Sequence, residues 1–255
     1  MTPQTGTPWL VEQPKPAARL RLYCFSYAGG SASMFHNWGA ALNPEVEVCA
    51  VQLPGRGARL AEAPIATMQT LLQALVPVIA RRNDRPFVFF GHSVGALVAF
   101  ELTRYLRLHG MSLPIHLIVS GCQAPQFRSP PKGYHQLKDD AFISVLREYN
   151  GTPEQVLENR ELMDLLLPAI RADFSLAENY RYRGGPVLNL PITLFAGEHD
   201  DIRAEGQVNG WSLETSQPLH TFWFDGGHFF VDTHRRQVLE QLDMALSAAI
   251  VEQYA

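Results

Sequence analysis

The stretch FVFFGHSVGALVAFELTRYL, residues 87–106, decides the fold. Its first four residues are an apolar run typical of a buried strand, and the residues after Ser93 have the apolar spacing of a helix. Between them stands a Gly-x-Ser-x-Gly motif, which on its own arises often by chance. With a strand before it and a helix behind it, the motif predicts a nucleophile elbow, and hence an α/β fold in which Ser93 sits on a tight turn.

The residues around Ser93 have the properties that such a turn requires. The serine backbone is strained there, and glycines at positions 91 and 95 avoid the clashes that larger residues would make. The helix behind Ser93 directs its N–H groups and its positive dipole end toward a reacting carbonyl. We therefore expect Ser93 to be a nucleophile and the Val94 amide to stabilise the oxyanion. His92 is expected to pack inside the elbow.

The rest of the chain alternates short apolar runs with helix-length segments. The expected strands are 21–26, 46–52, 87–90, 115–120, 192–196 and 221–224, and the expected helices are 67–82, 94–109, 139–149, 161–180 and 232–251. Several strands are apolar throughout, which indicates a parallel sheet that is covered on both faces. The sequence predicts one α/β domain over residues 1–255, with a mostly parallel central sheet and helices on both faces.

Residues from about 121 to 191 interrupt this alternation because they contain no convincing strand. A Pro-rich polar loop opens the segment, and two amphipathic helical stretches follow. A helical insertion beside a sheet is a natural lid over a site, so we expect a lid here, with a plain helical crossover as the alternative.

A serine nucleophile needs a base and an acid that orients the base, and in this fold the chain order is Ser, Asp or Glu, then His. His228 follows an expected strand, and the preceding glycine pair lets the loop present its imidazole. Asp200 and Asp201 both follow the strand 192–196, and the spacing after Gly197 favours Asp200. We expect Asp200 to hold the imidazole of His228 in the reactive tautomer.

The second oxyanion donor should come from the loop after the first expected strand. That loop reads FSYAGGS, residues 25–31, and its Gly-Gly pair lets backbone amides approach a substrate closely. The lipase-type His-Gly-Gly-Gly motif is absent. An ordinary strand-to-helix turn is the alternative.

Composition narrows the functional classes. A net charge of -4 without a basic run argues against a nucleic-acid partner. No apolar run reaches the roughly 18 residues of a membrane span, and residues 1–20 are predicted to be a flexible Pro-rich lead-in without a signal peptide. We expect a cytoplasmic monomer with three reduced, buried cysteines and with no metal or other cofactor.

Seven segments along nearly the whole chain resemble the discrete type II thioesterases of polyketide synthases and nonribosomal peptide synthetases. They are FSYAGGSASMF (25–35), VQLPGRGARLAE (51–62), FFGHSVGALVAFEL (89–102), NGTPEQVL (150–157), LLLPAIRADFSLAENYRY (165–182), FAGEHDD (195–201) and GGHFF (226–230). The resemblance implies an α/β-hydrolase fold, a triad of Ser93, Asp200 and His228, and an oxyanion hole formed by the Ala28 and Val94 amides. It further implies that the insertion at residues 121–191 is a lid over the acyl channel. Its expected partner is an acyl or peptidyl carrier protein, from whose phosphopantetheine arm the enzyme removes stalled acyl groups.

Other functions remain open at this point. A carboxylesterase for small oxygen esters would use the same triad, as would a medium-chain thioesterase of fatty-acid synthesis. An acyltransferase or macrocyclising release enzyme and a catalytically inactive binding protein are further alternatives. The basic side chains of Arg56, Arg59, Arg104 and Arg107 are expected to lie on the surface, solvated or in contact with an acidic carrier.

Overall fold

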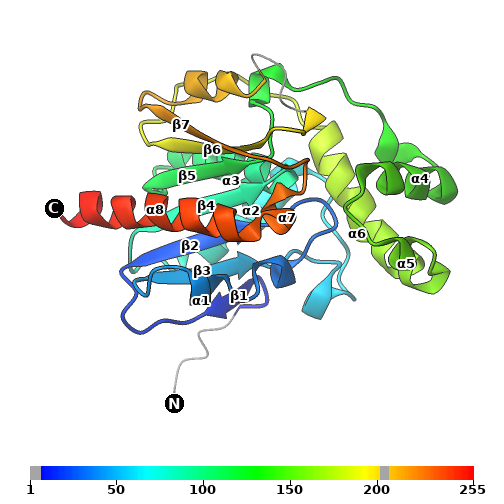
Figure 1. Cartoon of the computed structure of the whole chain (residues 1–255), viewed down its shortest axis with the longest axis horizontal. Coiled ribbons are helices and arrows are strands. Elements are labelled where there is room, and N and C mark those ends of the chain that lie inside the picture. Colours follow the sequence, from blue (N-terminus) through cyan, green and yellow to red (C-terminus); the bar gives the residue numbers. More distant parts are fainter. Residues whose placement is uncertain (1–6, 202–206) are drawn as a thin grey trace.

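The structure is a computed structural model that describes residues 7–201 and 207–255. A seven-stranded sheet crosses its centre in the order β1-β3-β2-β4-β5-β6-β7 (Figure 1). The strands are β1 (Leu10–Gln13), β2 (Leu20–Phe25), β3 (Val46–Val51), β4 (Phe87–His92), β5 (His116–Ser120), β6 (Ile192–Gly197) and β7 (Leu219–Phe224). β1 pairs with β3 in the antiparallel sense, and the other pairs are parallel. The predicted mostly parallel sheet is confirmed.

Helices cover both faces of the sheet, as predicted. They are α1 (Trp38–Ala41), α2 (Met68–Ala80), α3 (Val94–Leu108), α4 (Asp139–Tyr149), α5 (Glu154–Leu157), α6 (Arg160–Glu178), α7 (Phe230–Thr233) and α8 (Arg235–Tyr254). Figure 1 shows α8 in front of the sheet and α2 and α3 behind it. Side chains alternate along β2, so Tyr23 joins the apolar cluster with α2 and α3, whereas Cys24 joins the cluster with α1 and α8. The two clusters form the core.

The N-terminal segment differs from its prediction. Leu10–Gln13 forms the antiparallel edge strand β1, with Leu10 opposite Val51, whereas residues 1–20 were expected to be a flexible lead-in. Leu10 is buried against the sheet, and the Gln52 N–H donates to the Trp9 carbonyl. Four residues between polar and proline-containing flanks carry too little periodicity to predict a strand. Residues 1–6 of that segment lie outside the described residues.

Residues 121–191 add no strand to the sheet and instead carry α4, α5 and α6. Figure 1 shows these three helices together beside one end of the sheet. They have an apolar cluster of their own, built from Phe142, Leu146, Leu157, Met163, Leu167 and Ile170. A small core of this kind holds the three helices together as a unit against the larger body.

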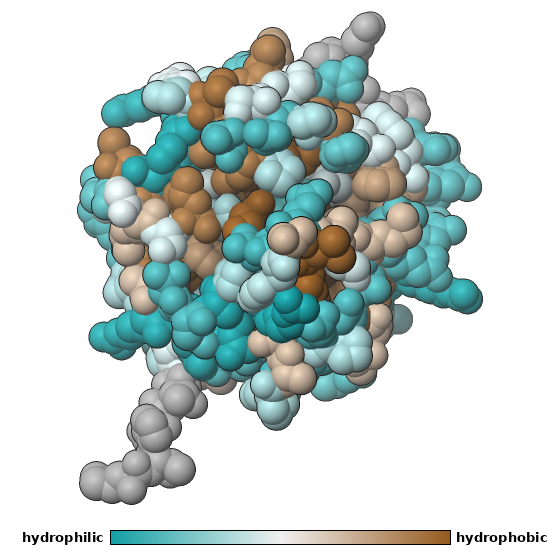
Figure 2. Space-filling view, turned by 90° about the vertical axis from the view of Figure 1, so that its left-hand side faces the viewer, coloured by the Kyte–Doolittle hydropathy of each residue, from teal (hydrophilic) through white to brown (hydrophobic). Residues whose placement is uncertain are grey.

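Figure 2 shows the side of the molecule that lies opposite these three helices, where hydrophobic side chains lie in patches separated by hydrophilic residues. No helix in the described part of the chain is long and apolar enough to cross a bilayer. The three cysteines are free and buried, as expected.

Candidate active site

Ser93 occupies the turn between β4 and α3 in the strained conformation that the motif predicted. Its φ is +57° and its ψ is -121°, a rare combination for a residue with a side chain. A Cβ atom at Gly91 would lie 2.3 Å from the Gly95 carbonyl oxygen, and one at Gly95 would lie 2.3 Å from the Phe25 carbonyl oxygen. Both glycines are therefore required by close backbone contacts.

The side chains of Ser93, His228 and Asp200 form one hydrogen-bonded chain. His228 Nε2 lies 3.0 Å from Ser93 Oγ, and His228 Nδ1 lies 2.8 Å from Asp200 Oδ2. Since a carboxylate can only accept, Nδ1–H donates to Asp200, and the Nε2 of the neutral ring accepts from the serine hydroxyl. Asp200 is 4% exposed, whereas Asp201 is exposed, so the geometry selects the first of the two candidate acids. This arrangement suits removal of the serine proton.

Backbone hydrogen bonds between neighbouring loops bring the acid to the base. The Glu198 N–H donates to the Phe224 carbonyl, and the His199 N–H donates to the Gly226 carbonyl. Gly197 permits this because a Cβ atom there would lie 2.5 Å from the Gly226 oxygen. The loops after β6 and β7 thus run together at the ends of parallel strands.

His92 lies inside the elbow, as predicted, and it supports the loop that carries His228. Its Nε2 lies 2.9 Å from the His228 carbonyl oxygen, and its Nδ1 lies 2.8 Å from Ser120 Oγ. The carbonyl accepts, so Nε2–H donates, and Nδ1 accepts from the Ser120 hydroxyl. Complete burial lowers the pKa of His92 well below its usual value, and the neighbouring His228 adds to this effect. His92 is therefore a neutral anchor.

The loop after β2 forms a tight turn beside the elbow. The Gly30 N–H donates to the Tyr27 carbonyl at 2.9 Å, and Gly29 has a φ of +76°. Among the backbone hydrogen bonds of turns, loops and helix ends in the described residues, none has the Ala28 or the Val94 N–H as its donor. Val94 begins α3, where the first N–H groups have no partner in the helix. Both amides thus have the free donor that an oxyanion needs.

A small cavity borders the elbow. It is lined by Phe25, Ser26, Val51, Leu53, Val94, Gly95, Val98, Asp173 and Leu176. Most of these side chains are apolar, and Asp173 and Leu176 come from α6. The helical segment 121–191 therefore forms part of the wall next to Val94.

The four arginines expected on the surface are engaged within the chain. Arg56 and Arg59 are 5% and 6% exposed and pair with Asp173 and Glu62. Arg104 pairs with Glu101, and Arg107 donates to the Val187 carbonyl. The prediction of a solvated or carrier-binding surface was wrong for the two buried arginines, because intramolecular acceptors stand where no sequence spacing reveals them.

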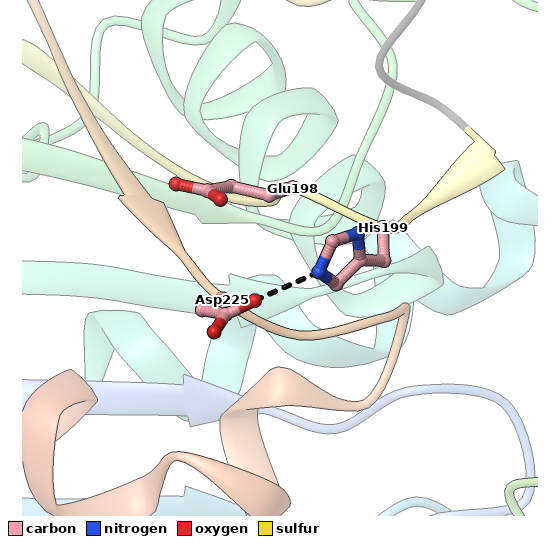
Figure 3. A group of neighbouring side chains, drawn as sticks. All are labelled: Glu198, His199 and Asp225. Atoms are coloured by element: carbon pink, nitrogen blue, oxygen red, sulfur yellow. Dashed lines mark hydrogen bonds and ion pairs between the residues drawn. The ribbon is translucent and has the colours of Figure 1, made fainter.

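Three exposed side chains near Asp200 could bind a metal ion by their chemistry. Ligand atoms of Glu198, His199 and Asp225 all lie within 4.8 Å of one another. Figure 3 shows His199 directed toward Asp225, with Nε2 at 2.7 Å from Oδ1. His199, which adjoins Asp200 in the chain, thus pairs with Asp225 and not with Ser93. The hydrogen-bonded chain of Ser93, His228 and Asp200 does not include these three side chains.

Sequence reasoning missed several residues that shape the site. Ser120 ends β5 and bonds His92, and Asp173 on α6 pairs with Arg56 from outside the 121–191 segment. Gly151 meets the ring of Phe229, since a Cβ atom at Gly151 would lie 2.1 Å from its Cζ. Residues 56, 151 and 173 lie in segments that resemble the thioesterase family, but the resemblance assigned no role to them. Their place in those segments is the one signal in the sequence that could have indicated their importance.

Comparison with known proteins identifies the family to which this chain belongs. The family model described as "Thioesterase domain" matches residues 20–246. The chain belongs to the thioesterase family. This thioesterase is 40% identical to the gramicidin S biosynthesis protein GrsT of Aneurinibacillus migulanus over 238 residues, which are 92% of this chain and 93% of that one.

A solved structure extends the likeness to three dimensions. The type II thioesterase BorB from the borrelidin biosynthetic cluster superposes with a TM-score of 0.83 at 40% identity, covering 92% of this thioesterase and 96% of that chain. The medium-chain S-acyl fatty acid synthase thioesterase of Rattus norvegicus is 32% identical, over 85% of this chain and 83% of that one. The predicted fold and family are confirmed, and the fatty-acid alternative has the weaker support.

Proposed function

We propose that this thioesterase hydrolyses acyl groups from the phosphopantetheine arm of acyl or peptidyl carrier proteins in polyketide or nonribosomal peptide biosynthesis. The hydrogen-bonded chain from Ser93 through His228 to Asp200 carries the chemical part of the proposal. The likeness to GrsT and to the type II thioesterase BorB supports the biosynthetic part. A monomeric state and a cytoplasmic location remain predictions from the sequence.

The proposed reaction has two steps at Ser93. His228 Nε2 takes the hydroxyl proton as Ser93 Oγ attacks the thioester carbonyl, and the Asp200 carboxylate stabilises the imidazolium that forms. The carbonyl oxygen becomes an oxyanion on the Ala28 and Val94 amides. The C–S bond then breaks, and His228 returns the proton to the leaving thiolate. Water attacks the acyl-serine through the same base and releases the free acid.

The helices α4, α5 and α6 are proposed as the lid of this site. Two side chains of α6 line the cavity beside Val94, and the α4–α5 loop reaches the residue after His228 through Gly151. Their separate apolar cluster allows movement as a unit. Movement of such a segment would admit the acyl arm and exclude bulk water during the reaction.

A Ser93→Ala variant tests the proposal. We expect its kcat on an acyl carrier protein to fall by about 10⁶, by analogy with other serine triads. The measurement is mass spectrometry of carrier proteins loaded with a panel of acyl groups, before and after exposure to enzyme. Ser212→Ala is the matched control, because Ser212 is exposed and, among the described residues, its hydroxyl bonds the Asn209 carbonyl alone. Near-normal hydrolysis by Ser93→Ala would exclude Ser93 as the nucleophile.

Rates on an oxygen ester with the same acyl group distinguish a thioesterase from a carboxylesterase. Carrier thioesters should be cleaved with a higher kcat/KM than the corresponding ethyl ester, and free acid should be the product. Preference for the oxygen ester would favour the esterase, and a ring or transferred ester as product would favour a cyclase or transferase.

A further inference from the structure

The turn from Tyr27 to Gly30 presents the proposed oxyanion donor, and its hydrogen bonds determine where that donor points. The Tyr27 carbonyl faces into the turn to accept from the Gly30 N–H. The peptide is trans, so the Ala28 N–H on the same peptide plane points the opposite way, out of the turn. A positive φ at Gly29 is typical of the third position of a type II turn. Any rotation of these peptide planes would redirect the Ala28 N–H.

One buried carboxylate on the lid helix holds the next peptide of this turn. Asp173 Oδ2 accepts from the Gly29 N–H at 2.8 Å, and Asp173 lies on α6, which belongs to the 121–191 segment. One turn earlier on the same helix, Ile170 packs over Gly29, since a Cβ atom there would lie 3.0 Å from Ile170 Cγ1. The turn is therefore in contact with α6 through both a charge and an apolar side chain.

Arg56 completes the arrangement from a third segment. Its Nη1 and Nη2 lie 2.5 and 2.8 Å from the two oxygens of Asp173 in a bidentate pair. The same Nη1 donates to the Gly30 carbonyl at 3.1 Å. Arg56 and Asp173 are 5% and 2% exposed in their side chains, so water screens the pair little. Together the two side chains bind the Gly29 N–H and the Gly30 carbonyl.

A purely stabilising role would not require these particular contacts. Buried ion pairs contribute little net stability compared with apolar side chains of similar volume. This pair instead makes two hydrogen bonds to the backbone of adjacent residues, one to the Gly29 N–H and one to the Gly30 carbonyl. Hydrogen bonds to the backbone fix the orientation of the peptide planes, and an oxyanion donor must have a fixed orientation.

We propose that Asp173, held by Arg56, is a positioning residue that orients the Tyr27–Gly30 turn, so that the oxyanion hole is complete only when lid helix α6 is seated. This inference rests on the proposed function. Asp173 contacts no reacting atom and acts through the backbone of Gly29. Seating of the lid and stabilisation of the oxyanion are thereby linked through one carboxylate.

The test is Asp173→Asn, which keeps the shape of the side chain but turns an amide N–H toward the guanidinium of Arg56. We expect kcat to fall by about 10- to 100-fold while KM changes less than about threefold, because the oxyanion donors stabilise the transition state more than the bound ground-state thioester. Affinity for an alkylboronic acid of matching chain length, which forms a tetrahedral adduct with Ser93, should fall in parallel with kcat. Denaturant unfolding checks that the variant is folded.

The control is Asp139→Asn, another aspartate of the lid that pairs with an arginine. Asp139 bonds Arg171 at 2.6 Å on the surface and does not touch the turn. It should keep kcat and boronate affinity within about twofold of wild type, as for other exposed ion pairs. If Asp173→Asn fails to fold, Arg56→Lys replaces it, because lysine keeps the charge without the bidentate geometry.

The outcomes are distinct. A folded Asp173→Asn enzyme with wild-type kcat and boronate affinity would overturn the inference. So would a rise in KM alone, because that result assigns Asp173 to substrate binding or lid closure. If the wild-type enzyme itself does not cleave acyl carrier proteins but still forms the boronate adduct, the proposed function fails, and the adduct measurement still decides the role of Asp173.

Discussion

The two proposed oxyanion donors are held in place by different kinds of structure. Val94 is fixed by backbone packing, since Gly91 and Gly95 bring β4, α3 and the end of β2 within contact of one another. Ala28 lies in a turn whose neighbouring peptides are held by buried charges from α6 and from the segment around Arg56. One proposed donor is thus held by the elbow packing, and the turn of the other makes its hydrogen bonds with the proposed lid helix α6 and with Arg56. We therefore expect movement of the proposed lid to act mainly on the Ala28 side.

Among the variants that test this contrast between the two donors, Gly95→Ala should have the largest effect, because it disrupts the backbone packing around Val94. The new Cβ atom would meet the Phe25 and Ser26 carbonyl oxygens at 2.3 and 2.5 Å, and backbone atoms cannot move aside as a flexible side chain can. We expect a loss of about 1–3 kcal/mol of unfolding free energy from overpacking. A shift of about 1 Å at the elbow should also lower kcat at least about 100-fold.

Urea unfolding and thioester hydrolysis measure the two effects of Gly95→Ala. The matched control is Gly184→Ala, where a Cβ atom meets nothing within 4 Å and φ is not positive. A Gly95→Ala enzyme as stable and active as Gly184→Ala would show that the elbow adapts, and the contrast between the two donors would disappear.

A smaller effect is expected at the anchor beneath the base. His92→Leu removes the donor to the His228 carbonyl and leaves the Ser120 hydroxyl unpartnered. Unsatisfied buried groups cost about 1–3 kcal/mol, so the unfolding free energy should fall by that amount near neutral pH. Loss of the hydrogen bond from His92 should also misplace His228 slightly. We expect kcat to fall about 10-fold, less than the roughly 100-fold that a misplacement of about 1 Å can cause.

The unfolding free energy of His92→Leu should also depend less on pH than that of the wild type. The folded-state pKa of His92 is lowered, so below about pH 6.5 the unfolded chain binds a proton that the folded chain does not. The stability that neutral His92 contributes is present above that pH and is lost as pH falls, by up to about 1.4 kcal/mol per pH unit. Urea titrations at pH 7 and pH 5 should show a smaller decline in the variant. An equal decline in both proteins would contradict a neutral His92.

The nucleophile side could be predicted in detail because its signals are local. The Gly-x-Ser-x-Gly motif, its flanking strand and helix, and the order Ser93, Asp200, His228 follow from residues adjacent in the chain or at strand ends. β1 was missed because an edge strand of four residues has little pattern, and the helix expected at 232–251 starts earlier and breaks at His234.

The lid side could not be predicted in the same way. Asp173 and Arg56 are 117 positions apart, and nothing in the position of Asp173 on an amphipathic helix indicates that it will meet a turn at Gly29. Buried partners of this kind are selected by tertiary contact, which single-sequence patterns do not record. Arg56 was accordingly placed on the surface, since arginines are mostly exposed unless paired.

The smallest effect should appear where the lid meets the base loop. Gly151 lies between α4 and α5, against the ring of Phe229, which in turn packs edge-on to His228 and Tyr27 with ring centroids 5.2 and 5.1 Å away. A methyl group in Gly151→Ala would force the lid loop away from the ring, because Phe229 is confined by its other neighbours. The charged contacts of Asp173 lie elsewhere on the lid, so the oxyanion turn should keep its shape.

We therefore expect Gly151→Ala to change KM for acyl carrier protein by about threefold, the effect of about 0.7 kcal/mol, with kcat nearly unchanged. Steady-state kinetics on the carrier substrate measure this. Gly184→Ala on the same segment is the control, since a Cβ atom there meets nothing within 4 Å and its φ, like that of Gly151, is not positive. A large fall in kcat for Gly151→Ala would mean that the lid acts on the base as well as on the turn, and the division between a sheet-held and a lid-held half of the site would be wrong.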